Sequence, residues 1–473
     1  MFRSMAMPDV LLISCYSLGH QPLGIAWPKA FLERAGFAPD SLDLAVEPWD
    51  DAKIRRAKLV AIAVPMHTAL RLGVRTAERI RRTNPQCRIV FHGLYALLNA
   101  EYLLAGIADD VFGGEFEESF VELVEQLERG ESRRTTYDAR RTNSTYDARR
   151  TNSTYDAPRT RLKFPLPSRK SLPPLTRYVK LRRNGADIAT GYVEASRGCL
   201  HHCLHCPIPP VYNGRFFVVP QDVVLGDIRR LVAAGAGHIT FGDPDFLNGP
   251  GHALRLVRAL HTEFPGVTYD FTAKIEHLLR HRALLPEFAR TGCAFVVSAV
   301  ESLSDVVLAN LEKGHTRADA LAAFDIMREA GIALRPSFMP FTPWATLDDY
   351  FELLDFVDSE DLVDQVDPVQ LTIRLLVPPG SSLLTRPAIQ PFLGALDRPA
   401  FTYRWTHPDP RMDALHADVT ALVAAAAGED PAATIARLHS LAAQRAGRAY
   451  IGGVRLPPPE RPIPARLTEP WFC

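Results

Sequence analysis

Short apolar runs alternate with amphipathic stretches from residue 9 to residue 130. Four runs rich in Val, Ile, Leu and Ala are predicted as buried strands: 10–15, 42–46, 59–65 and 88–92. The stretches with helical periodicity are 24–36, 69–83, 99–105 and 117–129. Apolar strands that alternate with helices are typical of a parallel sheet covered on both faces. We therefore predict a doubly wound α/β domain over residues 1–130, with a ligand site beyond the carboxyl ends of its strands.

The same alternation returns near residue 185 and continues to about residue 385. Six strands are predicted at 191–196, 238–241, 269–272, 294–299, 333–336 and 369–375. The helical stretches between and after them are 220–234, 251–263, 279–290, 304–311, 318–330 and 348–356. This order predicts a complete or partial β/α barrel over residues 185–400 with functional groups at the strand ends. Residues 401–473 hold two more helical stretches and a proline-rich tail, which predicts a helical C-terminal extension.

A polar repeat separates the two predicted domains. Thr-Tyr-Asp-Ala recurs with its tyrosines at Tyr137, Tyr146 and Tyr155, a period of nine that fits neither a solenoid unit nor a heptad. The repeat has no apolar face, and a proline-rich run follows it. We therefore predict a flexible interdomain linker over residues 131–184.

The composition narrows the class of protein. Lys and Arg together number 54, as do Asp and Glu, and this balance argues against a nucleic-acid partner because such a protein would need a basic surface. No segment has the roughly 20 consecutive apolar residues of a membrane span, and the run before Cys15 is too short for a signal peptide. Seven cysteines in 473 residues do not suit a disulfide scaffold. We expect a cytoplasmic protein with reduced thiols and no membrane partner.

Three of the cysteines lie within eight residues, as Cys199-x3-Cys203-x2-Cys206, directly after the first predicted strand of the barrel. In a reducing compartment clustered thiols favour metal binding. A structural zinc site would need a fourth ligand, which His201, His202 or His205 could supply. A cubane iron–sulfur cluster on three thiolates would instead leave one iron without a protein ligand.

This spacing in this strand context resembles the radical S-adenosylmethionine (SAM) superfamily. The resemblance implies an enzyme in which Cys199, Cys203 and Cys206 hold a 4Fe–4S cluster and the open iron binds SAM. It implies reductive cleavage of SAM to a 5′-deoxyadenosyl radical that acts on a small-molecule substrate, with electrons from a reductant such as flavodoxin or ferredoxin. The family usually has an aromatic residue near the adenine just before the third cysteine, and His205 stands there in this chain.

Positions at later strand ends extend the resemblance. Asp243 or Asp245 falls where the family carries a polar motif that faces the methionyl ammonium of SAM. Ser298 and Glu301 fall in a segment similar to the fourth-strand signature, in which the Glu accepts hydrogen bonds from the ribose hydroxyls. Arg335 ends the fifth strand, where it could hold a carboxylate by bidentate pairing. The structural alternatives are an Asp-Pro turn, a helix cap formed by a serine, and an interstrand salt bridge.

The amino-terminal half resembles the cobalamin-binding, Rossmann-like domain that precedes the barrel in one large radical SAM class. The resemblance is carried by Pro65-Met66-His67-Thr68, Phe91-His92-Gly93-Leu94 and the run Asp109-Asp110-Val111-Phe112-Gly113-Gly114. It implies that Gly93, Gly113 and Gly114 let backbone approach the corrin closely and that Thr68 offers a hydroxyl. The Asp-x-His-x-x-Gly motif of other cobalamin domains is missing. The alternative is a domain that has kept this fold and lost the cofactor.

The chain ends in Leu467-Thr468-Glu469-Pro470-Trp471-Phe472-Cys473, which resembles the tail of radical SAM proteins that end in Cys- or selenocysteine-Ala-Glu-Pro. Thr468 stands at the Ala position and Leu467 at the chalcogen position. Cys473 is then the terminal thiol, which we expect to be catalytic if the tail folds back to the substrate. The alternative is a frayed, exposed terminus.

Three functional hypotheses follow. If cobalamin is bound, methyl transfer to an unreactive carbon is the expected reaction. A cobalamin-free enzyme could instead transfer the 3-amino-3-carboxypropyl group of SAM to a soft acceptor such as arsenic or sulfur. The third hypothesis is an iron–sulfur redox sensor, against which Glu301 and the Asp243 region argue because a sensor needs no nucleoside pocket. The remaining cysteines, Cys15, Cys87 and Cys293, are predicted to be core or near-core thiols.

Overall fold

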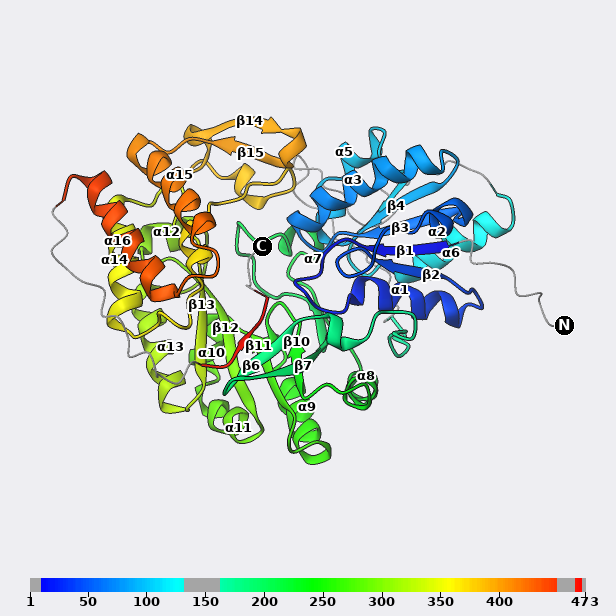
Figure 1. Cartoon of the computed structure of the whole chain (residues 1–473), viewed down its shortest axis with the longest axis horizontal. Helices are drawn as coiled ribbons and strands as arrows, with labels where there is room; N and C mark the ends of the chain where they lie inside the picture. Colours follow the sequence, from blue (N-terminus) through cyan, green and yellow to red (C-terminus); the bar gives the residue numbers. More distant parts are fainter. Residues whose placement is uncertain (1–9, 132–161, 449–463, 470–473) are drawn as a thin grey trace.

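The computed structural model describes residues 10–131, 162–448 and 464–469. The nine-residue repeat and Cys473 lie outside these ranges. Each predicted α/β unit contains one large sheet, parallel in the first unit and mostly parallel in the second, and a C-terminal region lies beside both (Figure 1).

The first sheet has the strand order β2-β1-β3-β4-β5, and all of its strands are parallel. Its strands are β1 Val10–Ser14, β2 Asp40–Asp43, β3 Leu59–Ala63, β4 Arg88–His92 and β5 Asp110–Phe112. Its helices are α1 Leu23–Arg34, α2 Asp51–Arg56, α3 His67–Thr83, α4 Leu94–Leu98, α5 Ala100–Leu104 and α6 Glu117–Glu128. Leu12 and Ala61 lie in the core shared with α1 and α6, whereas Ile13 and Ile62 lie in the core shared with α3. The predicted doubly wound domain is therefore confirmed.

The second sheet has the order β13-β12-β11-β10-β7-β6-β16 and forms an open, partial barrel. The parallel strands are β7 Ala186–Val193, β10 His238–Phe241, β11 Thr268–Thr272, β12 Cys293–Glu301 and β13 Ala333–Phe338. Two antiparallel strands, β6 Lys180–Arg183 and β16 Arg466–Leu467, extend the β7 edge. The helices are α8 Gln221–Ala233, α9 Pro250–Glu263, α10 Ile275–Arg280, α11 Leu285–Arg290, α12 Asp305–Asn310, α13 Arg317–Glu329 and α14 Leu347–Ser359. The partial β/α barrel is also confirmed.

The predicted sixth strand, 369–375, is wrong. Residues Pro368–Thr372 form a 3-10 helix, and only an isolated bridge joins Phe341 to Arg374. Asp367 accepts a hydrogen bond from the Val369 N–H and so starts this turn, with proline at its first position. The Gln370 side chain accepts from the Phe338 N–H at the open edge of β13, where a sixth strand would have paired. The predicted helix 279–290 is likewise interrupted between α10 and α11.

The described part of the expected linker packs on both sheets. Leu172 and Leu175 are buried in the core that the two units share. Arg169 forms a bidentate pair with Asp227 of α8 and also donates to the side-chain oxygen of Gln21.

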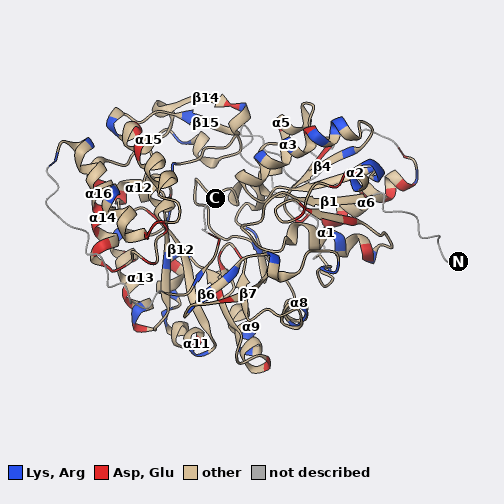
Figure 2. Cartoon of the chain, viewed as in Figure 1, with Lys and Arg blue, Asp and Glu red and all other residues tan. Residues whose placement is uncertain are grey.

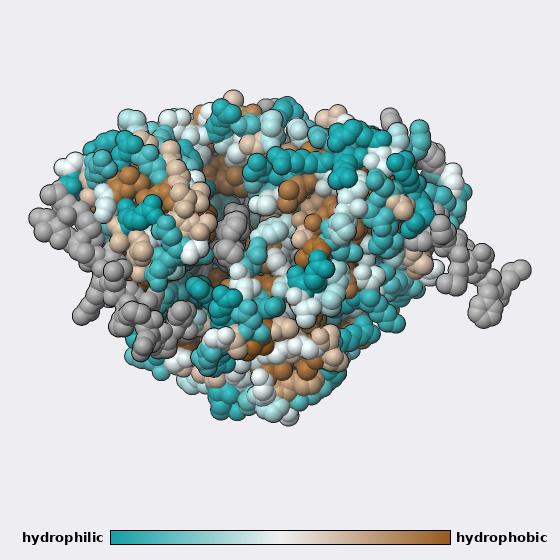
Figure 3. All heavy atoms as spheres, viewed as in Figure 1, coloured by the Kyte–Doolittle hydropathy of each residue, from teal (hydrophilic) through white to brown (hydrophobic). Residues whose placement is uncertain are grey.

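The C-terminal region begins with a hairpin of β14 Leu393–Asp397 and β15 Thr402–Trp405, followed by α15 Pro410–Ala425 and α16 Pro431–Ala446. Phe401, between the hairpin strands, is buried in the core of the first sheet. The face in Figure 3 is hollowed between this region and the N-terminal unit. Lys and Arg positions are interspersed with Asp and Glu positions along the outer helices (Figure 2), and no helix in the described ranges is long and apolar enough to cross a membrane.

Candidate functional site

The three clustered cysteines lie in a loop that follows β8 Ser196–Gly198, a short strand paired with β9 Phe216–Val218. Gly198 has φ +75°, and a Cβ there would lie 2.3 Å from the Arg215 carbonyl oxygen, so this tight turn requires glycine. Cys199 and Cys203 are buried, and Cys206 is half-buried. Burial above all, with the nearby Cys203 and Cys199 thiols, raises the pKa of Cys206 to about 12. A metal or cluster bound here would hold these cysteines as thiolates.

The three histidines of this loop have partners other than the thiols. His201 Nε2 lies 3.2 Å from His277 Nε2, and His205 Nε2 lies 3.1 Å from Glu301 Oε1. The His202 ring packs against Gly214, where a Cβ would meet its Nε2 at 2.4 Å. The contacts thus favour a three-thiol site over a zinc site completed by one of these rings.

The two candidate aspartates face different groups. Asp243 accepts hydrogen bonds from the Ala195 N–H at 2.9 Å and from the Ser196 hydroxyl, and burial raises its pKa to about 7. It therefore supports the start of the cysteine loop. Asp245, which is fully buried, lies with Oδ2 2.8 Å from His277 Nδ1 and 3.8 Å from His201 Nε2.

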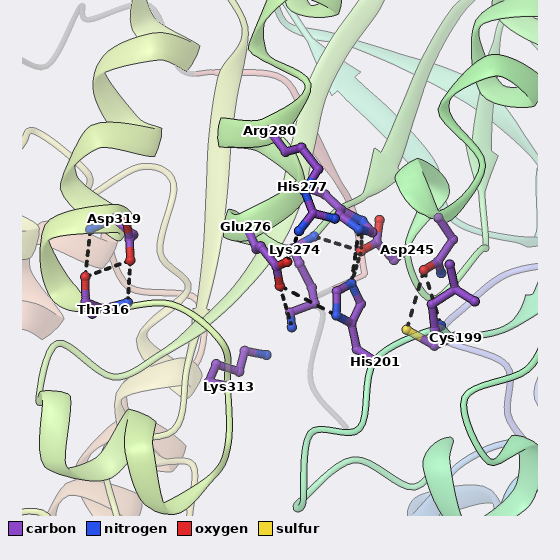
Figure 4. Close-up of polar contacts among 12 residues, drawn as sticks. Cys199, His201, Asp245, Lys274, Glu276, His277, Arg280, Lys313, Thr316 and Asp319 are labelled. Carbon is purple, nitrogen blue, oxygen red and sulfur yellow. Dashed lines mark hydrogen bonds and ion pairs between the residues drawn. The ribbon is translucent and has the colours of Figure 1, made fainter.

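His201, His277 and Asp245 form a compact polar group beside Cys199 (Figure 4). One ligand atom from each lies within 4.8 Å of the others, so the group can hold a metal ion or a small cation. Burial above all, with the positive charge of Lys274, lowers the pKa of His201 to about 4. The His201 imidazole is therefore neutral near pH 7, so a ring nitrogen can offer its lone pair to a cation held by this group.

Glu301 ends β12 in a strained conformation. Its φ is +67°, which non-glycine residues rarely adopt, and the strand pairing shifts register beside it. Its Oε1 lies 3.0 Å from Lys313 Nζ and 3.1 Å from His205 Nε2. Burial alone would raise the pKa of Glu301, but Lys313 and His205 hold it well below its usual range. The carboxylate is thus ionised and fixed next to the residue that precedes Cys206.

Ser298 and Arg335 lie on opposite faces of the second sheet, because Arg335 pairs in register with Val297, the neighbour of Ser298. Ser298 is fully buried, and its Oγ has no hydrogen-bond partner among the described residues. Strand alternation puts it on the face of β12 that carries the buried Val296 and Val300. Arg335 lies over the Phe295 ring, and its Nη1 has no hydrogen-bond partner in the described ranges. Burial lowers the pKa of Arg335 to about 10, which still leaves it charged near neutral pH.

The candidate glycines of the N-terminal unit follow the carboxyl ends of its strands. A Cβ at Gly93, where φ is +112°, would lie 3.0 Å from the Val64 carbonyl oxygen, and one at Gly113 would lie 2.7 Å from Leu97 Cβ. Internal packing therefore already requires glycine at both positions. Gly114 has room beside it: among the described residues the single atom within 4 Å of its Cβ position is Val211 Cγ1, at 3.9 Å.

Two more groups at this edge could contact a ligand. Thr68 is half-buried in the first turn of α3, next to His67, whose Nε2 lies 2.7 Å from the Ala400 oxygen. His92, the last residue of β4, is 2% exposed, and its Nε2 has no hydrogen-bond partner within the described ranges. Burial lowers the pKa of His92 to about 3. A neutral, unpaired imidazole nitrogen at the carboxyl edge of the sheet fits a bound ligand there.

Two residues that contribute contacts to this site, Lys313 and Arg197, were not assigned a function from the sequence. Lys313 belongs to the run Asn310-Leu311-Glu312-Lys313-Gly314 that follows the Glu301 signature, so its position was the available signal. Arg197 stands two residues before Cys199, and two of its carboxylate partners, Glu115 and Glu117, are remote in sequence. The other cysteines conform to expectation: Cys15 and Cys87 are buried, and Cys293 is near-core.

A partial barrel with a three-thiol loop after its first parallel strand, set against a doubly wound domain, defines the class of protein. Residues 193–357 match the family model described as the Radical SAM superfamily, so this segment is a radical SAM domain. This match confirms the predicted resemblance to the radical SAM superfamily. Members of this family are enzymes that use a 4Fe–4S cluster and SAM.

Two solved structures share the fold of nearly the whole chain. The cobalamin-dependent SAM radical enzyme OxsB, with aqua-cobalamin bound, has a TM-score of 0.68 and 15% identity, over 89% of this chain and 67% of that one. The radical SAM methyltransferase TsrM from Kitasatospora setae, with cobalamin and a [4Fe-4S] cluster bound, has a TM-score of 0.60 and 17% identity, over 93% of this chain and 89% of that one.

Curated relatives match the radical SAM part. A putative methylthiotransferase of Methanocaldococcus jannaschii is 22% identical over 190 residues, 37% of this chain and 40% of that protein. The ribosomal protein uS12 methylthiotransferase RimO of Desulfosudis oleivorans is 28% identical over 190 residues, 37% of this chain and 42% of that protein. The chain thus matches about two fifths of the length of these relatives.

Proposed function

We propose that the chain is a cobalamin-dependent radical SAM enzyme that transfers a methyl group to an unreactive carbon of a small-molecule substrate. The observation that carries the proposal is the contact between the thiol loop and the carboxyl edge of the first sheet. Helix α7 Pro209–Tyr212, which follows Cys206, packs on α4 of the N-terminal unit. Val211 of α7 lies next to the open position at Gly114. A ligand at the sheet edge would therefore adjoin a cluster on the thiols.

The thiols of Cys199, Cys203 and Cys206 fit a 4Fe–4S cluster, which when reduced supplies the electron that cleaves SAM. In this proposal Asp245 accepts hydrogen bonds from the methionyl ammonium. The His201 ring beside it is neutral near pH 7, so it adds no positive charge that would repel that cation. Asp243 has its donors within the protein and is assigned to support of the loop.

Glu301 is assigned to the ribose hydroxyls of SAM. It is ionised near neutral pH, and its strained backbone fixes the carboxylate in one direction. His205, which is expected near the adenine of SAM, lies beside the carboxylate of Glu301, which is expected near the ribose. Arg335 is charged and buried with a free Nη1, which suits a carboxylate of the substrate or of SAM. Ser298 faces the core, so its assignment to SAM has the weaker geometric support.

Cobalamin is assigned to the edge formed by Thr68, Gly93, Gly113 and Gly114. The open position at Gly114 and the unpaired His92 nitrogen support a ligand there. The proposal includes a reductant such as flavodoxin or ferredoxin. Cys473 lies outside the described residues, so its catalytic role stays a prediction.

The test is anaerobic reconstitution of the full chain with iron and sulfide, followed by hydroxocobalamin, desalting and an absorption spectrum. The proposal predicts that iron–sulfur and corrin absorption both persist and that dithionite with SAM yields 5′-deoxyadenosine. Absence of corrin at saturating hydroxocobalamin would overturn it. Release of 5′-methylthioadenosine would instead indicate 3-amino-3-carboxypropyl transfer, and a reducible cluster with no SAM cleavage would indicate a sensor.

A further inference from the structure

Arg197 lies between the thiol loop and the N-terminal unit. Its side chain is 9% exposed, and it precedes Cys199 by two residues. Nη1 donates to Glu117 Oε1 at 2.7 Å and lies 3.4 Å from Glu115 Oε1, while Nε donates to Glu194 Oε2 at 3.2 Å. One buried guanidinium thus joins the strand that leads into the thiol loop to the first turn of α6.

Two of the three carboxylate partners, Glu115 and Glu117, come directly after the proposed cobalamin segment. Glu115 follows Gly114 in the chain, and Glu117 is the first residue of α6. Tyr212, the last residue of α7, also reaches Glu115, with 3.5 Å between its hydroxyl and Oε1. Any ligand that moves or orders residues 113–117 therefore acts on groups bound to Arg197.

Aromatic packing restricts the guanidinium to this position. It lies 5.3 Å from the ring centre of Trp27 and 5.1 Å from that of Phe164. Trp27 Nε1 donates to the same Glu194 oxygen at 3.0 Å. Because the site is enclosed, Arg197 cannot exchange its carboxylate partners for water without a large cost.

Some acceptor atoms in the network around Arg197 have hydrogen-bond partners and others do not. Three carboxylates surround one guanidinium, and the Oε2 atoms of Glu115 and Glu117 are buried with no hydrogen-bond partner in the described part of the chain. A buried charge group with unmet acceptors changes in energy when either attached segment shifts. Such a group transmits a displacement from one segment to the other.

We infer that Arg197 is a positioning residue that couples ligand binding at the carboxyl edge of the first sheet to SAM binding at the thiol loop. The inference rests on the proposed function, because it takes cobalamin as the ligand at that edge. Coupling of this kind is reciprocal: the factor by which cobalamin changes the affinity for SAM equals the factor by which SAM changes the affinity for cobalamin.

The experiment measures the dissociation constant of SAM with the reconstituted full chain, in the presence and absence of saturating hydroxocobalamin. We expect hydroxocobalamin to tighten SAM binding at least about fivefold in the wild type. In Arg197→Gln, and in Arg197→Lys, which keeps the charge but loses the planar fork, that ratio falls to about one. Iron content is measured in each variant to show that the cluster is present.

Two further variants keep the test decisive. Glu117→Gln removes the charge of one partner and preserves its shape, and it is expected to lower the same ratio even if Arg197 variants fail to fold. Arg258→Gln disrupts an exposed ion pair with Glu287 on α9 and α11, and it is expected to leave the ratio unchanged.

The outcomes separate the inference from the proposed function. The inference would be overturned if the wild type bound both ligands without mutual influence. It would also be overturned if folded Arg197 and Glu117 variants kept the wild-type ratio. Either result would leave the proposed function intact. Wild type that retains no corrin would overturn both.

Discussion

Lys313 Nζ lies 3.0 Å from Glu301 Oε1, and the lysine is nearly fully buried. Glu301 is the last residue of β12, and Lys313 follows α12, so the pair joins the end of the strand to the loop that follows the next helix. The same Glu301 oxygen is the partner of His205, which directly precedes Cys206. Lys313 therefore holds Glu301, the residue proposed to bind the ribose of SAM, against the cysteine loop proposed to bind the cluster.

Replacement of Lys313 by methionine should remove the ion pair that holds Glu301 in place. Removal of one partner of a buried ion pair is expected to lower the free energy of unfolding by about 3 kcal/mol. The pKa of Glu301, which is depressed in the wild type, should rise. SAM affinity, measured from about pH 8 to pH 5, should then fall with decreasing pH in Lys313→Met and stay constant in the wild type. Lys313→Arg is the control, and equal pH profiles for all three proteins would contradict this prediction.

Asp243 and Asp245 offer a matched pair of substitutions. Asp245→Asn should weaken SAM binding about tenfold to a hundredfold, because it removes a charge-assisted hydrogen bond to the ammonium. Asp243→Asn should change SAM affinity little, because its carboxylate is directed to Ala195 and Ser196. Equilibrium binding to cluster-loaded protein checks both. The reverse order of the two effects would exchange the proposed roles.

The pKa of Asp243 also predicts how stability depends on pH. Burial raises it from about 4 to about 7, so the folded state binds a proton more tightly than the unfolded chain does. Its contribution is fully present below about pH 4 and is lost as the pH rises to about 7. Asp243→Asn should therefore show a smaller decline in stability across that interval than the wild type. Chemical denaturation of both proteins at several pH values provides the comparison, and parallel curves would disprove the assignment.

The cysteines divide into two groups with different expected behaviour. Alanine at Cys199, Cys203 or Cys206 should abolish retention of iron and cleavage of SAM. Alanine at Cys87 should preserve both, because this thiol is buried in the first sheet and burial raises its pKa to about 12. Iron and sulfide analysis after anaerobic reconstitution distinguishes the two groups. Retention of a full cluster by Cys203→Ala would refute the ligand set.

Arg169 should matter for stability although it lies in the segment expected to be a flexible linker. Its guanidinium is 9% exposed and pairs with the buried Asp227, so Arg169→Ala should lower the free energy of unfolding by about 3 to 5 kcal/mol. Arg229 lies on the same helix as Asp227 and forms an exposed pair with Glu263 of α9. Arg229→Ala should therefore change the free energy of unfolding little. Urea denaturation of both variants gives the comparison, and equal midpoints would show that the segment contributes nothing.

Elements with a clear local pattern could be predicted from the sequence. The apolar run at 88–92 is the strand β4, and the helical stretch predicted at 220–234 is the helix α8. β5 was missed because it has three residues and begins with Asp110, whose carboxylate is neutralised by Arg88 on the neighbouring strand. The strand predicted at 369–375 failed because Asp367 and Pro368 start a 3-10 turn within a run of β-type residues.

The sequence by itself determined the two α/β units and the three-thiol loop, because strand periodicity and cysteine spacing are local properties of the chain. The tertiary structure alone decided that Asp245 lies beside His201 and His277 while Asp243 accepts from Ala195 and Ser196, and that packing accounts for Gly93 and Gly113. It also decided the pairing of Arg197 with Glu117, which are 80 residues apart. Such contacts depend on how distant elements pack, and burial then sets the charge of each group.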